Sequence, residues 1–288
     1  MEIKKVFFED KNYPKLLREI KDPPKILYYC GNLEIANENC FAIVGTRRCS
    51  TYGKEVALRF ALDLIDFGFV IVSGFAPGID TIAHKAAIEK KKPTIAVLGT
   101  GLDKKLIYPK TNLKLIDKIL ECGGCLISEL PPGSHGTKYT FPQRNRIISG
   151  ISLGVLVVEA RMKSGALITA EYAIEQKRKV FAVPGSIFSQ TSKGCHYLIK
   201  RGVKLVEDAK DILEELGMKA KIEKEKIEGE SFEEKLILEA LKEGALDIEK
   251  IIEKTKLPPQ KVASTISILE IKGKIKNLGG QIYAINFG

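Results

Sequence analysis

The chain has 288 residues, 44% of them hydrophobic, and a formal net charge of +10 at pH 7. The apolar content excludes a disordered chain, and no apolar run is long enough for a bilayer or placed as a signal peptide, so we expect a cytoplasmic protein without a membrane partner. The basic balance favours a polyanion such as nucleic acid, and the alternative is a solvated Lys/Glu surface like that of heat-adapted proteins.

Residues 1–38 form an N-terminal lead-in segment that is too small for a core of its own. Tyr13–Leu17 is predicted as a short helix, and Asp22–Pro24 as an extended turn that leads to the apolar stretch Ile26–Tyr29. The first domain is therefore expected to begin at residue 39.

Between residues 39 and 217, short apolar runs alternate with longer helical patterns. The runs, most of them continuously apolar as in strands buried on both faces, are Cys40–Val44, Phe69–Val72, Thr94–Leu98, Cys125–Ser128, Val155–Val158, Lys179–Ala182 and Lys204–Val206. The helical patterns with one apolar face are Lys54–Phe67, Thr81–Lys90, Asn112–Glu121, Ala166–Gln176 and Ala209–Leu216. This alternation predicts an α/β fold with a doubly wound parallel sheet, in which ligands bind beyond the carboxyl ends of the strands.

The rest of the chain is predicted to be a charged linker, residues 218–231, and a small second domain, residues 232–288. Helices at Phe232–Leu241, after Asp247 and at Gln260–Lys272 precede a hairpin that turns at Gly279-Gly280, which is the winged-helix plan. The polar residues expected on the outer face of the third helix are Gln260, Lys261, Ser264, Thr265 and Ser267. Because arginine is missing from them, contact with a protein partner or weak binding to duplex DNA is at least as well supported as the reading of a DNA sequence by this helix.

The six cysteines do not form a recognisable metal site. Cys122 and Cys125 have CxxC spacing, but a structural zinc site usually needs a second such pair, which the sequence lacks. Cys40 and Cys125 each begin a strand, so we expect small buried thiols there and no bound metal.

The first two loops at strand ends carry glycine and polar groups. Gly45 lets the chain turn off its strand before Arg47, and Ser50 or Thr51 can cap the following helix, so this loop offers an anion site. In the second loop Gly74 and Gly78 allow close backbone approach, Asp80 or Thr81 is expected to cap the helix, and His84 is expected to be a packed residue. The GxGxxG and GxxxxGK[ST] signatures are absent, so we predict neither a nicotinamide cofactor nor ATP hydrolysis by a P-loop.

The segment from Lys138 to Ile148 concentrates cations and aromatic rings. Its cations are Lys138, Arg144 and Arg146, and its rings are Tyr139 and Phe141. Cations neutralise phosphates, and an exposed ring can stack on an unpaired base. The alternative is that Phe141 belongs to the core and that Arg144 or Arg146 forms ion pairs, which is the more natural for Arg146 because Ile147-Ile148 is expected to begin a buried helix.

Two further loops complete the edge. Ser164 is expected to cap a helix whose first N–H groups are free for an anion, with Gly165 following it, and Lys193 adds a cation near the last loop. None of the three histidines, His84, His135 and His196, stands in an evident Ser-His-Asp order, so the edge offers cations, glycines and a ring but no nucleophile–base pair.

Together these motifs resemble the DNA-processing protein A (DprA/Smf) family over about residues 10–216. The matching segments, in chain order, are Val44-Gly45-Thr46-Arg47, Ser73-Gly74-x-Ala76-x-Gly78-Ile79-Asp80-x3-His84, Phe141-Pro142-x-Arg144-Asn145-Arg146-Ile147-Ile148-x-Gly150-x-Ser152, Ser164-Gly165-x3-Thr169-Ala170, Val183-Pro184-Gly185 and Gly194-Cys195-x2-Leu198-Ile199-x2-Gly202. The C-terminal region resembles the family's winged helix more loosely.

The resemblance implies an extended Rossmann-like domain that dimerises, binds single-stranded DNA and loads the RecA recombinase in natural transformation, with neither catalysis nor a cofactor. It makes Arg47 and Lys138 phosphate contacts and Phe141 a base-stacking platform. The residues that would line or shape the same DNA site are Gly45, Thr46, Gly74, Arg144, Asn145, Ser164 and Gly165, and we add Lys193 from its loop. Two positions depart from the family pattern, which often has Arg at Pro77 and usually has Asn at His196.

Two other functions compete with DNA binding. The first is a nucleotide phosphoribohydrolase of the lysine-decarboxylase-like kind, whose phosphate loop is loosely similar to Ser164-Gly165-x3-Thr169-Ala170-Glu171. Against it, Leu167 stands where that loop has a glycine, at a position that a bound phosphate would crowd. The other alternative is an adaptor without DNA binding, in which the C-terminal domain recruits partners.

Overall fold

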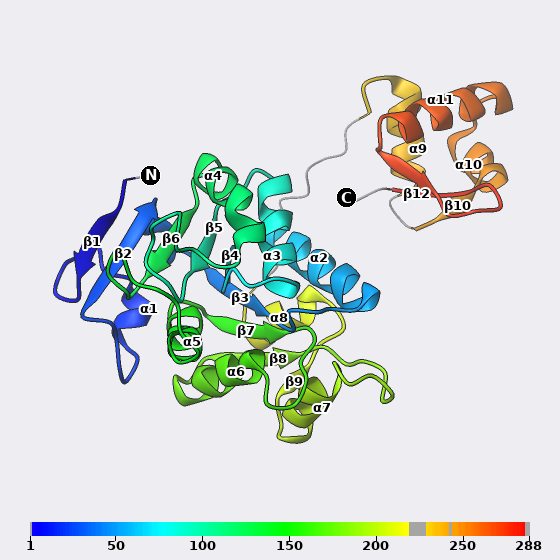
Figure 1. Ribbon diagram of the computed structural model, residues 1–288. Helices are drawn as coiled ribbons and strands as arrows, with labels where there is room; N and C mark the ends of the chain where they lie inside the picture. Colours follow the sequence, from blue (N-terminus) through cyan, green and yellow to red (C-terminus); the bar gives the residue numbers. More distant parts are fainter. Residues whose placement is uncertain (1, 219–228, 242–243, 286–288) are drawn as a thin grey trace. The chain divides into compact units, whose positions relative to one another are not determined.

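The structure, a computed structural model, describes residues 2–218, 229–241 and 244–285 (Figure 1). It divides into two compact units, Met1–Ile222 and Glu223–Gly288. Most of the predicted linker lies outside the described residues.

A nine-stranded sheet in the order β1-β2-β6-β5-β4-β3-β7-β8-β9 forms the centre of the first unit. The strands that run parallel to one another are β3 (Cys40–Val44), β4 (Val70–Ser73), β5 (Thr94–Val97), β6 (Cys125–Ser128), β7 (Gly154–Val157), β8 (Lys179–Ala182) and β9 (Lys204–Leu205). Each lies at a run predicted from the sequence, and the parallel α/β architecture is confirmed. Continuous apolar runs predicted most of these strands correctly because β3 to β7 are buried on both faces, whereas the two residues of the edge strand β9 are exposed.

The N-terminal segment adds antiparallel strands to one edge of this sheet. Its elements are β1 (Lys4–Phe7), α1 (Lys15–Arg18), β2 (Ile26–Gly31) and the 3₁₀-helix η1 (Leu33–Asn37). Strand β2 pairs antiparallel with β6, with Tyr28 opposite Ser128, and β1 pairs with β2. The lead-in therefore buries Leu27 and Val6 by extending the existing sheet instead of forming a core of its own.

Helices cover both faces of the sheet (Figure 1). They are α2 (Thr51–Asp66), α3 (Ile79–Glu89), α4 (Leu113–Glu121) after the 3₁₀-helix η2 (Lys110–Asn112), α5 (Thr140–Gly150), α6 (Gly165–Glu175), α7 (Lys193–Lys200) and α8 (Ala209–Glu215). Side chains of β3 alternate between two cores, Ala42 facing the core that includes Ile147 and Ile43 facing the core that includes Phe60. The sheet is therefore doubly wound.

Three helix starts test the predicted caps. Ser50 is the N-cap of α2, and its hydroxyl accepts a hydrogen bond from the N–H of Gly53 at 3.0 Å. The prediction for α3 is wrong, because Gly78 with a φ of +81° is the N-cap, while the Asp80 carboxylate folds back to accept from the N–H groups of Gly74 and Ala76. Ser164 occupies the N-cap position of α6 as predicted, but its hydroxyl makes no capping hydrogen bond.

Helix α5 corrects a second prediction. The sequence predicts a buried helix that begins at Ile147, but the helix begins seven residues earlier, at Thr140. Because it is a helix whose inner face packs on the sheet, Arg144, Asn145 and Arg146 are buried and Phe141 lies in its first turn.

The second unit is a winged helix, as predicted. Its elements are α9 (Phe232–Leu241), β10 (Leu246–Asp247), α10 (Ile248–Thr255), α11 (Pro259–Ile271), β11 (Ile275–Asn277) and β12 (Ile282–Ile285), with the sheet order β10-β12-β11. Asp247 caps α10 by accepting from the N–H of Lys250 at 2.8 Å. On α11 the expected outward position of Thr265 is wrong, since it is buried, and Lys261 is paired with Glu233 at 2.7 Å.

The cysteines are free thiols, and Cys40 and Cys125 are fully buried as expected. Burial raises the pKa of both thiols, which keeps them protonated. Among the described residues, no cluster of three or more His, Cys, Asp or Glu side chains could hold a metal ion. No helix in the described part of the chain is long and apolar enough to cross a membrane.

Candidate nucleic-acid interface

The loops that follow β3, β7 and β8 are joined at the carboxyl edge of the sheet by Glu159, a residue that sequence reasoning missed. Its carboxylate is buried and accepts hydrogen bonds from the N–H of Ser50 at 2.9 Å, the hydroxyl of Ser50 at 2.7 Å and the hydroxyl of Thr191 at 2.8 Å. The sequence does contain a feature that could have predicted this role. Glu159 follows a buried strand directly, and a buried carboxylate there must accept hydrogen bonds from neighbouring loops.

Close backbone packing holds the first two loops together. The N–H of Ile79 donates to the Thr46 carbonyl at 3.3 Å, and the N–H of Thr46 donates to the Glu159 carbonyl at 2.7 Å. A side chain on Gly45 would meet Ile79 at 2.5 Å, and one on Gly78 would collide with the Thr46 carbonyl oxygen. Gly45 and Thr46 therefore shape the loop, while Arg47 is left exposed on it.

Arg47 and Phe141 come together at this edge. The Arg47 guanidinium carbon lies 5.9 Å from the centroid of the Phe141 ring, although the two residues are far apart in the sequence. The ring is half-buried, since side chains on Gly99 and Gly136 would meet it at 2.7 and 2.8 Å. The exposed ring of Tyr108 stands edge-on to it at 6.0 Å. The sequence reasoning did not single out these two glycines or Tyr108.

Lys138 lies just before α5, three positions ahead of Phe141. It is exposed, and its ammonium group lies 5.0 Å from the centroid of the Tyr139 ring. The structure thus places an exposed guanidinium against a partly exposed ring, with an exposed ammonium group in the segment that leads to that ring.

Arg144 lies beneath this edge and is buried. Its Nη1 donates to the carbonyl of Gly74, directly after β4, at 2.6 Å and to that of Val97, the last residue of β5. Its Nε donates to the Asn145 side-chain oxygen at 3.2 Å. Both the Arg144 Nη2 and the Asp80 Oδ2 lie 2.8 Å from the point where a Cβ on Gly74 would stand. The bare Gly74 therefore leaves room for the buried Arg144 guanidinium, which ties two strand ends to α5, and for the Asp80 carboxylate beside it.

Burial shifts the pKa values of this inner group. It raises the pKa of the Asp80 carboxyl to about 6, against the opposing effect of Arg144 and two backbone donors. It lowers the pKa of Arg144 to about 10, so the guanidinium stays charged at neutral pH. His84 is fully buried as expected, and burial lowers its pKa to about 3, so the imidazole is neutral.

The remaining predicted residues fall into two places. The Asn145 side-chain amide donates to the Gly165 carbonyl at 3.0 Å, which joins α5 to the start of α6 beside Ser164. Lys193, in contrast, is the first residue of α7 and lines a separate surface hollow with Met162 and Ile187. The structure does not show it beside Arg47 and Phe141.

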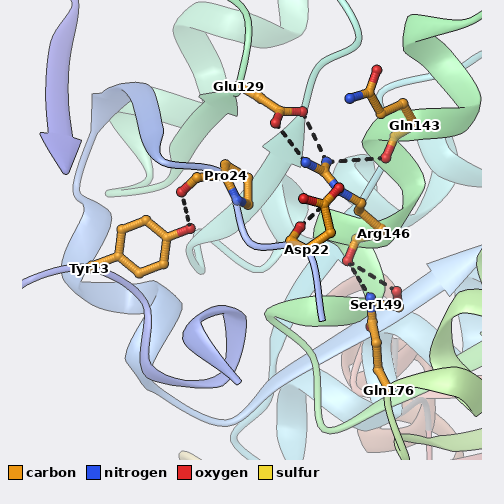
Figure 2. A network of polar contacts seen from close by, with 8 residues as sticks. All are labelled: Tyr13, Asp22, Pro24, Glu129, Gln143, Arg146, Ser149 and Gln176. Atoms are coloured by element: carbon orange, nitrogen blue, oxygen red, sulfur yellow. Dashed lines mark hydrogen bonds and ion pairs between the residues drawn. The ribbon is translucent and has the colours of Figure 1, made fainter. Parts of the chain in front are cut away.

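Arg146 has a structural role, as the alternative for it predicted (Figure 2). Its guanidinium makes a two-pronged contact with Glu129, at 2.9 and 2.6 Å, and its Nε donates to the Asp22 carbonyl at 3.1 Å. The Gln176 amide donates to the Arg146 carbonyl at 2.9 Å, and the Tyr13 hydroxyl holds the same N-terminal turn through the Pro24 carbonyl at 2.7 Å. This network fastens α5, which carries Phe141, to the N-terminal segment and to α6.

The fold and this edge define a Rossmann-like protein with a winged-helix unit and with a guanidinium, glycine turns and an aromatic ring gathered beyond the carboxyl ends of its strands. The chain belongs to the DprA/Smf family of DNA-processing proteins. The family model described as DNA recombination-mediator protein A matches residues 4–217, and the DprA winged helix domain matches residues 223–281.

Relatives and solved structures agree with this assignment. The chain is 48% identical over 206 residues to DNA processing protein DprA of Streptococcus pneumoniae, covering 72% of each chain, and 46% identical over 204 residues to protein Smf of Escherichia coli, covering 71% of this chain and 54% of that one. The S. pneumoniae crystal structure superposes with a TM-score of 0.69 at 45% identity, covering 75% of each chain. DNA processing protein A of Helicobacter pylori, described for its single-stranded DNA binding mode, has a TM-score of 0.66 at 31% identity, with 75% of this chain and 96% of that one covered.

Proposed function

We propose that this chain binds single-stranded DNA without sequence preference at the edge that holds Arg47 and Phe141, and that it loads the RecA recombinase onto that strand in natural transformation. The contact between the Arg47 guanidinium and the Phe141 ring carries the proposal. A phosphate and an unstacked base are neighbours on a single strand, and a cation beside an aromatic ring matches that pair. The binding mode described for the H. pylori relative supports it.

The proposed roles follow the geometry. Arg47 and Lys138 are exposed and contact phosphates, and Phe141 stacks on a base. The residues proposed to shape the site beneath or beside them are Gly45, Thr46, Gly74, Arg144, Asn145, Ser164 and Gly165. Lys193 contacts the strand at a distance from this group. Arg144 acts from below, because its guanidinium is buried against the ends of β4 and β5.

The rest of the proposal concerns the whole protein. We propose a lead-in at residues 1–38, a DNA-binding domain at 39–217, a linker at 218–231 and a winged-helix domain at 232–288, with a homodimer formed through the Rossmann-like domain in the cytoplasm. The protein binds DNA without catalysis. The position of Leu167 argues against the phosphoribohydrolase alternative. Leu167 lies in the first turn of α6, where that family has a glycine, and its side chain packs in the core.

Salt dependence tests the binding. If about five cations meet phosphates, log affinity should fall with log salt at a slope of about −3 to −4, since each contact on a single strand contributes about −0.7. The measurement is a fluorescence-anisotropy titration of labelled oligothymidylate at several salt concentrations, with a duplex of equal length as the matched ligand. A flat salt response, or equal affinity for the duplex, would contradict the proposal, and failure to bind either oligomer would favour the adaptor.

RecA loading is tested apart from binding. On single-stranded DNA already coated with single-strand-binding protein, the chain should shorten the lag before RecA hydrolyses ATP, because a loader nucleates filaments that the coat otherwise blocks. An unchanged lag with intact DNA binding would reject the loading role and leave the binding role standing.

A further inference from the structure

Two large apolar side chains stand at the apex of a rigid turn between β8 and α7. Ile187 and Phe188 are 66% and 89% exposed. The turn is closed by the Ser189 N–H, which donates to the Ser186 carbonyl at 3.0 Å, and it is tied down by a 2.8 Å hydrogen bond between the hydroxyls of Ser189 and Thr191. Turns favour Gly, Pro, Asn, Asp and Ser, so Ile-Phe at an apex serves no need of the turn itself. Exposed apolar groups held in place in this way mark a binding surface.

A surface hollow of about 420 Å³ adjoins this apex. It is lined by Met162, Ile187, Lys193, His196, Tyr197 and Lys200. Two of these residues are lysines and none is acidic, so the local field favours an anion. The apex residue that lines the hollow is Ile187, and Phe188 follows it in the chain. Cations without a carboxylate among them, next to an exposed aromatic residue, suit a nucleotide better than a protein surface of mixed charge.

The apex is continuous with the edge that holds Arg47. The Tyr52 hydroxyl at the start of α2 donates to the Pro184 carbonyl at 2.8 Å, and the Thr191 hydroxyl donates to Glu159, which also holds Ser50. In the sheet, β8 is separated from β3 by β7 alone, and two strand spacings amount to about 10 Å. A strand that lies on Arg47 and Phe141 therefore needs only a short further run to reach the turn.

We propose that this turn is a second single-strand subsite, in which Phe188 stacks on a base and Lys193 contacts an adjoining phosphate of the strand bound at Arg47 and Phe141. The subsite rests on the proposed function and extends it by naming where the strand continues. The hydrogen bonds of the turn fix the backbone that carries Phe188, so little backbone entropy is lost when a base stacks on the ring. Its occupant is the flanking part of the same DNA strand.

The absence of tryptophan from the chain makes this subsite directly observable. In Phe188→Trp the indole is the sole tryptophan, and its emission should be quenched by an oligothymidylate of about 20 nucleotides but much less by one of about six, which suffices for the first subsite alone. The matched control is Phe232→Trp, which replaces a 70% exposed phenylalanine in the winged helix and should show no such length dependence.

Affinity supplies the second measurement. Phe188→Ala should reduce the ratio of long-oligomer to short-oligomer affinity about tenfold, which corresponds to about 1.4 kcal/mol and falls within the range for one stacked base. The subsite is overturned if the quenching in Phe188→Trp, or the affinity loss in Phe188→Ala, is the same for the long and the short oligomer. It is also overturned if neither oligomer produces either effect while wild type binds DNA. Both results leave the proposed function standing. Failure of wild type to bind single strands overturns both. If the emission of the new tryptophan falls when the protein concentration is raised without DNA, then the turn contacts a second copy of this chain, and the subsite is overturned.

Discussion

Replacement of Arg47 by glutamate is expected to weaken binding of single-stranded DNA about a hundredfold at low salt. The change turns an attraction to phosphate into a repulsion, and a hundredfold is about 2.8 kcal/mol, which is moderate for reversing one charge near a protein surface. The loss should be the same for all sequences, because phosphate contacts carry no sequence information. It also removes the group that lies against Phe141. Anisotropy titration measures the change.

A charge reversal elsewhere separates this local effect from the loss of net charge. Arg59 is exposed in the middle of α2, more than two helical turns from its start, and Arg59→Glu alters the net charge by the same amount. It should weaken binding only slightly, and raised salt should remove that small effect by screening. If Arg47→Glu binds like Arg59→Glu, and Lys138→Glu does so too, then the assigned edge is not the DNA site.

Gly78→Ala is expected to destabilise the first unit by about 4 kcal/mol. The residue has a φ of +81° and a ψ of −127°, a conformation close to glycine-only, and a methyl group there would collide with the Thr46 carbonyl and lie 2.8 Å from the Arg47 carbonyl. Backbone strain of about 1–3 kcal/mol adds to an overpacking cost of about 1–3 kcal/mol. The midpoint of thermal unfolding should fall by roughly 8–16 °C. Circular dichroism of the variant on heating measures it.

Gly68→Ala is the matched control for this substitution. Gly68 has a similar φ of +84°, but nothing lies within 4 Å of a Cβ placed on it, so only the backbone strain remains. We expect about 1–2 kcal/mol from that strain alone. Equal losses in the two variants would show that the contact between the first two loops is not tight, and the account of how Arg47 is positioned would then be wrong.

Local pattern was enough to predict the strands and the winged helix. The run Cys40–Val44 coincides with β3, and Phe232–Leu241 coincides with α9, because both depend on which side chains are apolar and at what spacing. The winged-helix plan followed from three amphipathic segments and a glycine turn. Glycines at strand ends likewise marked the loops in which backbone approaches backbone, as Gly45 and Gly78 do.

The same kind of reasoning failed where a side chain has two possible partners. Asp80 stands where a capping residue belongs, but its carboxylate turns back to the Gly74 and Ala76 N–H groups, since Gly78 has already begun the helix. Arg144 is expected from the sequence either to line the DNA site or to form an ion pair, but its guanidinium is buried on strand-end carbonyls. Each choice depends on donors and acceptors supplied by distant parts of the chain.

The amino-acid sequence by itself determined the parallel α/β class, the winged helix and the loops that carry glycine and cations, because hydrophobic periodicity and backbone freedom are local properties. Only the tertiary structure decided which of those cations face water and which are fastened inside. It set the Arg47 guanidinium against the Phe141 ring, buried Arg144 beneath them and fastened Arg146 to Glu129. Exposure and pairing are properties of the assembled layers, since a side chain is buried only when segments remote in sequence close over it.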